Sequence, residues 1–268
     1  KKVELKKAKV IAKPKLQVEP VDKSISLEMS SIVIPHPQKT SWGGEDAVFT
    51  KGRNFGVFDG VSGAEKKRGV ALYSKTLAGE MRKTVGKGSL SMGEMSTILG
   101  NAAKLANKGA TGASTALVGS LSEDGILSIL NVGDSAGIVL REGKIVAKTR
   151  QIIHSFDCPY QLSDTSPDKP RDGTRLQLKV QKGDVVLVAS DGVFDNLNDD
   201  LITQTVVDSG GSAGKIAKKV AEQSRKISLD KSADTPYAKV AGRNGLSEYK
   251  SGVGGKVDDI SCVVLRCK

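Results

Sequence analysis

Hydrophobic residues recur at helical spacing in two stretches of the chain. They fall three or four residues apart, at Val70, Tyr73, Leu77, Met81 and Val85 in the first stretch and at Met95, Ile98, Leu99, Ala102 and Leu105 in the second. This spacing places the apolar side chains on one side of an α-helix. Two more helices are predicted at about 199–208 and 212–228. The predicted helices therefore come in two pairs.

Short β-rich runs predict strands before, between and after the helix pairs. They cover 46–50, 54–59, 114–121, 126–132, 137–140, 145–148, 184–189 and 260–266. The order of elements lacks the strict alternation of a parallel α/β sheet. It favours an α+β fold in which two packed antiparallel sheets are flanked by helix pairs, a four-layer αββα sandwich.

Two segments lack a clear pattern. Residues 16–40 are punctuated by prolines and are expected to be irregular, so that 1–40 forms a basic N-terminal arm and 41–268 a single domain. Residues 229–256, rich in glycine and lysine, are expected to form a long loop before the last strand. Long ordered loops are uncommon unless they are functional, which favours a substrate-recognition flap over a solvated surface excursion.

The net charge of +11 suggests a nucleic-acid partner, but its distribution argues against one. Residues 1–15 hold seven lysines and one glutamate, and aromatic residues make up only 4% of the chain. We therefore expect no nucleic-acid partner. The basic tail is interpreted either as a solvated arm or as an attraction to an anionic partner, such as a phosphoprotein or a membrane surface.

Compartment and processing are indicated only weakly. No apolar run approaches the length of about 18 residues that a membrane-spanning helix needs. Three cysteines without metal-ligand spacing suggest ordinary thiols in a reducing compartment. The chain begins without methionine, so we expect a trimmed or processed form.

The signal for chemistry is a set of acidic residues at the ends of predicted strands. Asp59 ends one strand, Asp191 follows another, and Asp258 precedes the last; Glu45, Asp46, Asp134 and Asp259 occupy similar positions. Strand ends are rigid, and carboxylates that converge there suit hard cations such as Mg²⁺ and Mn²⁺. Because Asp-Gly is also a common turn dipeptide, each such pair taken alone is more often a turn than a metal ligand.

Six motifs, in order, resemble the type 2C, or PPM, family of metal-dependent protein phosphatases. They are Gly44-Glu-Asp46, Phe58-Asp-Gly-Val-Ser-Gly63, Gly112-Ala-Ser-Thr-Ala116, Asn131-Val-Gly-Asp-Ser135, Ala189-Ser-Asp-Gly-Val-Phe-Asp195 and Lys256-Val-Asp-Asp-Ile-Ser261. The family fold is an antiparallel β-sandwich between helix pairs, which agrees with the predicted order of elements. The resemblance implies hydrolysis of phosphoserine or phosphothreonine in proteins by a metal-activated water.

The resemblance also implies roles for individual residues. Asp59 matches the carboxylate that bridges two Mg²⁺ or Mn²⁺ ions, and the Gly60 carbonyl contacts one of them. Asp191 and Asp258 match the other direct ligands. Glu45 and Asp46 match positions that hold metal-bound waters, and Asp134 matches a position linked to a third, weaker metal. Asp195 and Asp259 are expected to support the site through hydrogen bonds.

Two positions depart from the family pattern. Val61 stands where many members have a histidine that protonates the leaving oxygen, so that side-chain acid is missing here. Ser41 stands where many members have an arginine that binds the phosphate of the substrate. The residue that binds phosphate here, the phosphate clamp, is therefore unassigned, and the candidates are Lys39 and a basic residue of 229–256 such as Arg243. The two histidines, His36 and His154, are expected to be surface or packed residues.

Other segments resemble a compact organellar branch of the family. They are Asp59-Gly-Val-Ser-Gly63, Phe156-Asp-Cys-Pro-Tyr-Gln-Leu162 and Thr235-Pro-Tyr-Ala238. This branch implies a chloroplast stromal enzyme that acts on phosphoproteins of the photosystem II core, and we expect a monomer. A catalytically inactive member that binds phosphoproteins is the alternative; retention of the three aspartates argues against it.

Overall fold

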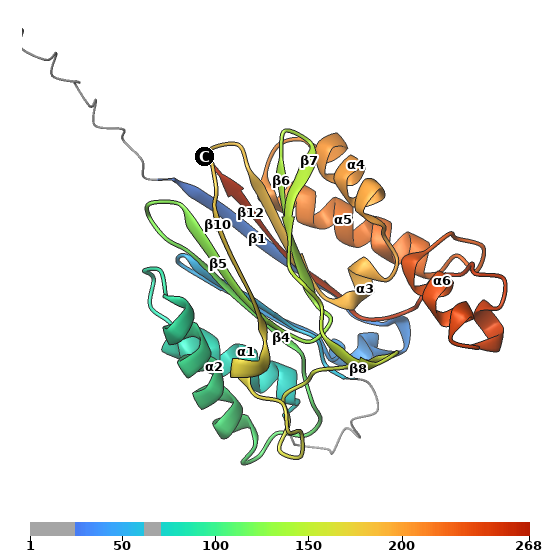
Figure 1. The fold of residues 1–268 in the computed structure, drawn as a ribbon, viewed down its shortest axis with the longest axis horizontal. Helices are drawn as coiled ribbons and strands as arrows, with labels where there is room; N and C mark the ends of the chain where they lie inside the picture. Colours follow the sequence, from blue (N-terminus) through green and yellow to red (C-terminus); the bar gives the residue numbers. More distant parts are fainter. Residues whose placement is uncertain (1–24, 62–70) are drawn as a thin grey trace, which may run out of the picture.

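The computed structural model describes residues 25–61 and 71–268, which form a sandwich of two five-stranded antiparallel sheets (Figure 1). The basic residues 1–15, Val70 of the first predicted helix, and Ser62 and Gly63 of the second motif lie outside the described residues. Within the described part, no helix is long and apolar enough to cross a membrane.

The first sheet has the strand order β1-β12-β11-β6-β7. Its strands are β1 (Leu27–Ile34), β12 (Ile260–Cys267), β11 (Val185–Ala189), β6 (Ala136–Arg141) and β7 (Lys144–Lys148). The β12 strand lies between β1 and β11 and is almost wholly buried, and its apolar residues alternate between the two faces of the sheet. Ile260 and Val264 face the helices, while Val263 and Leu265 face the second sheet.

The second sheet has the order β10-β5-β4-β3-β2. Its strands are β10 (Thr174–Lys179), β5 (Ile126–Val132), β4 (Ala116–Leu121), β3 (Asn54–Phe58) and β2 (Ala47–Lys51). A separate hairpin pairs β8 (Ile153–Ser155) with β9 (Cys158–Pro159). In Figure 1 this hairpin lies at the end of the sandwich where α3 (Asp191–Phe194) begins.

Three apolar clusters hold the layers together. One lies between the sheets, around Phe55, Ile129 and Val263. A second packs α1 (Tyr73–Thr84) and α2 (Met92–Ala106) against the second sheet, and a third packs α4 (Asp199–Ser209) and α5 (Ala213–Ser228) against the first. The structure thus confirms the four-layer αββα sandwich, because each sheet buries one face against the other sheet and one against a helix pair.

The prediction that 16–40 is irregular is wrong for residues 27–34. They form β1, which pairs along its whole length with β12, so this part of the predicted arm belongs to the sandwich. Leu27 and Met29 pack between the sheets, whereas Ile32 and Ile34 pack toward the helix layer. Because the apolar residues change from one face to the other halfway along the strand, the sequence lacks the regular alternation of apolar and polar residues that predicts a strand.

The prediction that 229–256 lacks secondary structure is also wrong. The segment contains α6 (Pro236–Arg243) and a 3₁₀ turn at Ser247–Tyr249. Thr235 caps α6 by accepting a hydrogen bond from the Ala238 amide at 3.1 Å, and Pro236 occupies the first helical turn. The hydroxyl of Thr235 also donates to the Gly254 carbonyl, which ties the two ends of the segment together.

Candidate active site

Strand ends from both sheets meet at one end of the sandwich around a cavity of about 380 Å³. Five residues predicted from the sequence line it: Asp59, Gly60, Asp134, Asp191 and Asp258. They come from the end of β3, the turn between β5 and β6, the start of α3 and the residues before β12. The fold therefore brings together side chains that lie up to about two hundred positions apart in the sequence.

Asp59 and Asp191 line the same cavity, close enough for the charge of one carboxyl group to act on the other. Desolvation raises the pKa of Asp59 well above its usual value, and the charge of Asp191 raises it further. Burial also acts to raise the pKa of Asp191, but the charge of the Lys256 ammonium and its hydrogen bond to the Asp191 carboxylate outweigh burial, so this pKa is lowered. The pKa values of the two neighbouring carboxyl groups are therefore shifted in opposite directions.

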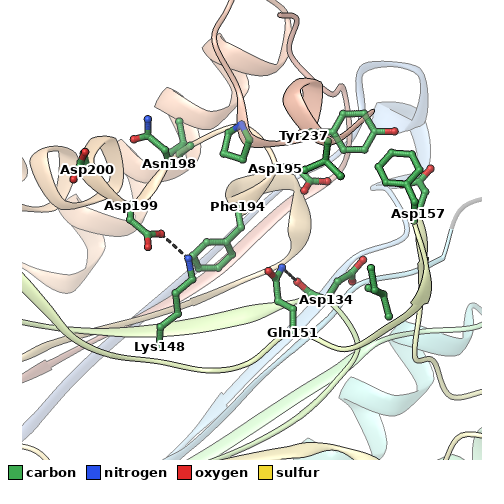
Figure 2. Close-up of a pocket in the computed structure, with 15 residues that line it drawn as sticks. Asp134, Lys148, Gln151, Asp157, Phe194, Asp195, Asn198, Asp199, Asp200 and Tyr237 are labelled. Atoms are coloured by element: carbon green, nitrogen blue, oxygen red, sulfur yellow. Dashed lines mark hydrogen bonds and ion pairs between the residues drawn. The ribbon is translucent and has the colours of Figure 1, made fainter. Parts of the chain in front are cut away.

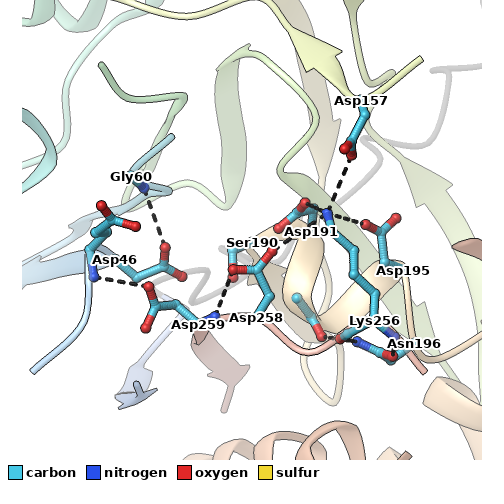
Figure 3. A network of polar contacts seen from close by, with 12 residues as sticks. Asp46, Gly60, Asp157, Ser190, Asp191, Asp195, Asn196, Lys256, Asp258 and Asp259 are labelled. Atoms are coloured by element: carbon cyan, nitrogen blue, oxygen red, sulfur yellow. Dashed lines mark hydrogen bonds and ion pairs between the residues drawn. The ribbon is translucent and has the colours of Figure 1, made fainter. Parts of the chain in front are cut away.

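Lys256 is the resident cation of this cluster (Figure 3). Its ammonium lies 2.5 Å from Oδ2 of Asp191, 2.8 Å from Oδ2 of Asp195 and 3.5 Å from Oδ2 of Asp258. The Asp157 carboxylate lies at 3.8 Å. Burial acts to lower the pKa of Lys256, but these carboxylates raise it well above the usual value, so the ammonium is charged at neutral pH.

One cation does not neutralise the cluster. Desolvation and neighbouring charges raise the pKa of Asp46 to about 7. The pKa of Asp195 is also raised to about 7, with desolvation the main cause, and that of Asp258 is raised to about 6 by desolvation and by Asp191. Carboxylates that resist ionisation together in a desolvated site are suited to divalent cations, which would restore their charge.

A buried oxygen of the Asp134 carboxylate also indicates a cation site. Oδ1 of Asp134 is buried and accepts no hydrogen bond from any described residue. Buried carboxylate oxygens without a donor are costly, and a bound cation would satisfy this one. Across 25–61 and 71–268, no three acidic, histidine or cysteine side chains are arranged to hold a metal ion as they stand. The donor set fits hard cations, provided that the side chains around Lys256 rearrange to admit them.

Behind the cavity, Asp259 fixes the segment that carries Glu45 and Asp46. Its carboxylate accepts hydrogen bonds from the backbone amides of His36 at 2.6 Å and Glu45 at 2.9 Å. These are hydrogen bonds of the kind expected for Asp259, and its support of the active site stays a prediction. Gly44 permits the approach: its φ is +69°, and a Cβ there would lie 2.1 Å from Oδ1 of Asp259.

Glu45 and Asp46 are buried beside the cavity but do not line it. The Asp46 carboxylate accepts hydrogen bonds from the Gly60 amide at 3.3 Å and the Ser261 hydroxyl at 2.7 Å, so it orients the peptide that follows Asp59. The Glu45 carboxylate pairs with Lys39. Both residues are thus placed to hold neighbouring groups, and their predicted contact with metal-bound water remains a prediction.

The two candidates for the phosphate clamp are separated by the fold. Lys39 lies in a 3₁₀ helix (Pro37–Trp42) and lines the cavity, where it contacts Glu45 and Asp259. Arg243, at the end of α6, is not among the lining residues. Val61 does line the cavity, in the position where many family members have histidine, and its amide donates to the Ala113 carbonyl at 3.1 Å.

The histidines and cysteines have structural surroundings. His36 caps the Pro37–Trp42 helix through Nδ1, although it also lines the cavity. His154 stacks on Tyr160 and pairs with Asp168, outside the lining residues. All three cysteines are free thiols, as predicted, and burial raises the pKa of Cys262 to about 12.

Sequence reasoning missed the part that Lys256 and Asp157 play in the site. Lys256 is the first residue of the last family motif, and its position two residues before Asp258 is the signal that could have identified it. Asp157 carried no such signal. It reaches the cluster because the β8–β9 hairpin, in which its φ is +58°, folds over the strand ends.

Comparison with known proteins identifies relatives at both the sequence and the structure level. The chain is 34% identical over 254 residues to the probable protein phosphatase 2C 1 of Oryza sativa subsp. japonica, covering 90% of this chain and 76% of the relative. It is 34% identical over 267 residues to the probable protein phosphatase 2C 26 of Arabidopsis thaliana, covering 93% and 87%. No model of a protein family matches the chain.

Among solved structures, the photosystem II phosphatase PBCP is similar, with 32% identity, a TM-score of 0.79 and coverage of 91% of this chain and 99% of that one. The catalytic domain of the serine/threonine phosphatase PstP, solved with two manganese ions, shares the fold at 15% identity and a TM-score of 0.59, covering 90% and 99%. The chain belongs to the protein phosphatase 2C family of Mg²⁺- or Mn²⁺-dependent protein serine/threonine phosphatases.

Proposed function

We propose that this phosphatase uses two divalent cations, which Asp59, Asp191, Asp258 and the Gly60 carbonyl would hold, with Asp59 as the carboxylate shared between them. The observation that carries the proposal is the meeting of these four residues in one cavity, with carboxyl groups too crowded to ionise together. When bound, the cations supply positive charge for the phosphoryl oxygens and an activated water.

The remaining acidic residues act around this centre. Asp46 holds the Asp59–Gly60 peptide through the Gly60 amide, and Asp259 anchors the backbone of Glu45. Both support the proposed water-mediated roles of Glu45 and Asp46. Asp134 is the candidate for a weaker third metal; its orphaned Oδ1 supports this, whereas the nearby charge of Lys256 opposes it.

Lys39 is the candidate phosphate clamp that this geometry favours. Its ammonium is only partly exposed and lies at the cavity wall, where the phosphate of a substrate would add to its contacts with Glu45 and Asp259. A lysine there acts as a point charge and lacks the paired donors of an arginine. Val61 offers no proton to the leaving oxygen, so protonation falls to water.

The proposed substrates are phosphothreonine and phosphoserine proteins of the photosystem II core in the thylakoid membrane. The enzyme is proposed to be a monomer of the chloroplast stroma that approaches them at the membrane surface. The similarity to the photosystem II phosphatase PBCP over 91% of the chain supports this choice. A catalytically inactive role is disfavoured, because Asp59, Asp191 and Asp258 are all retained and meet in one cavity.

The test uses purified protein with p-nitrophenyl phosphate, a phosphothreonine peptide and phosphorylated thylakoid membranes. Wild-type activity on all three substrates should require Mn²⁺ or Mg²⁺ and should disappear when a chelator is added. The Asp191→Asn variant should be inactive on all three even with metal. Exposed Asp208→Asn is the matched control and should behave as wild type. Activity on the small ester and the peptide, with no loss of phosphate from core proteins, would contradict the proposed substrate alone.

A further inference from the structure

A second cavity of about 630 Å³ opens beside the metal-site cavity (Figure 2). The two share Asp134 and Asp157 in their walls, so they adjoin each other. The second cavity lies between the β7 strand and β8–β9 hairpin on one side and α3, the start of α4 and α6 on the other. We call it the flanking groove. Its volume is in the range that accommodates a few residues of a ligand.

Apolar side chains from three elements form one part of the flanking groove. Phe156 of the hairpin and Tyr237 of α6 face each other with ring centroids 5.7 Å apart, and Phe194 of α3 contributes a third ring. Ile153 and Val240 also line it and are 51% and 44% exposed. Two exposed aliphatic residues beside paired aromatic rings provide a surface that an apolar side chain of a ligand would cover.

The charges of the flanking groove are mainly negative. Five aspartates line it, at 134, 157, 195, 199 and 200, against one lysine, Lys148. The Lys148 ammonium pairs with Asp199 at 2.6 Å and lies over the Phe194 ring. Asp200 is exposed, and half of the Asp157 side chain is exposed. Lys148 and Lys256 offset part of this charge, and the exposed carboxylate of Asp200, beside Asp199, is placed to attract a ligand segment that carries a cation.

The groove wall is held in place by backbone contacts. The Tyr237 amide donates to the Asp195 carbonyl at 3.0 Å, which joins α6 to the end of α3. Asn196 donates to the carbonyls of Gly192 and Lys256, both at 2.9 Å, and so links α3 to the metal-site segment. A ligand in the flanking groove would thus be positioned relative to the metal site through short, direct connections.

We propose that the flanking groove binds the residues next to the phosphorylated serine or threonine of a protein substrate, and that it selects an apolar side chain together with a lysine or arginine. The apolar side chain lies against Phe156, Tyr237 and Val240, and the cation lies near Asp199 and Asp200. The inference rests on the proposed function, since the phosphate must occupy the adjoining cavity at the same time.

The test compares two phosphothreonine peptides of equal length. The first carries leucine and lysine on each side of the phosphothreonine. The second carries serine in place of each leucine and glutamate in place of each lysine. Wild type should show a kcat/KM about tenfold higher for the first peptide. The double variant Ile153→Ser/Val240→Ser should lose most of this preference and keep its turnover of p-nitrophenyl phosphate. Asp199→Lys/Asp200→Lys should reverse the preference for charge.

Val207→Ser is the matched control, because Val207 is 54% exposed on α4 and does not line the groove. It should match wild type on both peptides. If both peptides are hydrolysed with equal kcat/KM, the proposal for the flanking groove is overturned but the proposed function stands. If neither peptide is hydrolysed, both the groove proposal and the proposed function are overturned. Equal losses on peptide and small ester in the groove variants, or a dimer that Val240→Ser dissociates, would also overturn the proposal.

Discussion

The ammonium of Lys256 lies 2.5 Å from Oδ2 of Asp191, between the start of α3 and the segment that leads into β12. The contact joins a residue proposed as a metal ligand to a positive charge of the protein itself. The side chain of Lys256 is only 17% exposed, and that of Asp191 is 11% exposed. In such surroundings each charge depends on the other, since water screens neither well.

Lys256→Met should lower the stability of the metal-free protein by about 3 kcal/mol, because it leaves buried carboxylates without their cation. Saturating Mn²⁺ should then raise the melting temperature more in this variant than in wild type, since the added charge replaces the lost one. Chemical and thermal unfolding with chelator and with Mn²⁺ measure both effects.

The control for that comparison is Lys218→Met. Lys218 pairs with Glu222 across one turn of α5, and both side chains are at least half exposed. Exposed pairs contribute about 0.2–1 kcal/mol, so this variant should differ little from wild type with or without Mn²⁺. Equal behaviour of the two variants would mean that Lys256 does not neutralise the cluster.

The metal-free protein should become less stable as the pH rises from 5 to 8. The pKa values of Asp46 and Asp195 are about 7 in the folded protein, that of Asp258 is about 6, and the ordinary value is 3.8. The folded state therefore binds more protons than the unfolded state in this range, and the stabilisation present at low pH is lost as these groups ionise.

Thermal unfolding in chelator at several pH values measures this dependence. Saturating Mg²⁺ should flatten it, because bound cations favour the ionised carboxylates. Asp195→Asn should weaken it, since one of the raised groups is removed. A melting temperature that rises steadily from pH 5 to 8 without metal would refute the assignment of these carboxyl groups as protonated.

The sequence predicted the buried elements well, because their residues report burial directly. The β5 strand was predicted with its observed bounds, and β11 and β12 to within one residue. The edges of the sheets were harder. In β1 the apolar residues change face, and β10 was not predicted, although Leu176 and Leu178 alternate with polar residues, since an edge strand is half exposed.

The same division holds in the active site. Asp59, Asp191 and Asp258 stand at strand or helix ends within motifs, so their convergence follows from the fold. Lys256 and Asp157 enter the cluster through the tertiary placement of a glycine-rich segment and a hairpin. No local pattern encodes such a placement. The flanking groove depends likewise on α6, whose glycine-rich surroundings concealed the Thr235-Pro236 helix start.

Asp59→Asn, Asp191→Asn and Asp258→Asn should each reduce phosphatase activity at least about 100-fold while the fold persists. An amide matches the shape of the carboxylate but lacks its charge, so metal binding should weaken. Turnover of p-nitrophenyl phosphate and calorimetric titration with Mn²⁺ provide independent measurements. Near-normal turnover in folded Asp191→Asn protein would exclude Asp191 as a ligand.

Val61→His should leave turnover of p-nitrophenyl phosphate within about threefold of wild type, whereas a limiting proton donor would yield a gain of about 100-fold. Val61 lines the cavity, and its surroundings accommodate an aliphatic side chain that needs no hydrogen-bond partner, so we expect no group positioned to orient an imidazole ring. A p-nitrophenol leaving group needs little help from an acid, so an alkyl phosphate is measured in parallel. A large gain on the alkyl phosphate would show that proton donation limits the rate.

Gly44→Ala should disrupt the active site from behind and reduce activity by about tenfold or more, together with a stability loss of about 1–3 kcal/mol. Gly44 has a φ of +69°, which alanine adopts poorly, and the Cβ of alanine would collide with the Asp259 carboxylate that holds the Glu45 amide.

Gly79→Ala is the matched control. Gly79 lies within α1, a Cβ there meets nothing within 4 Å, and alanine should stabilise the helix by up to about 1 kcal/mol. Activity, titration with Mn²⁺ and thermal unfolding of both variants distinguish a steric effect at Gly44 from a general effect of replacing glycine by alanine. If Gly44→Ala keeps wild-type activity and Mn²⁺ affinity, the contact with Asp259 does not position the active site.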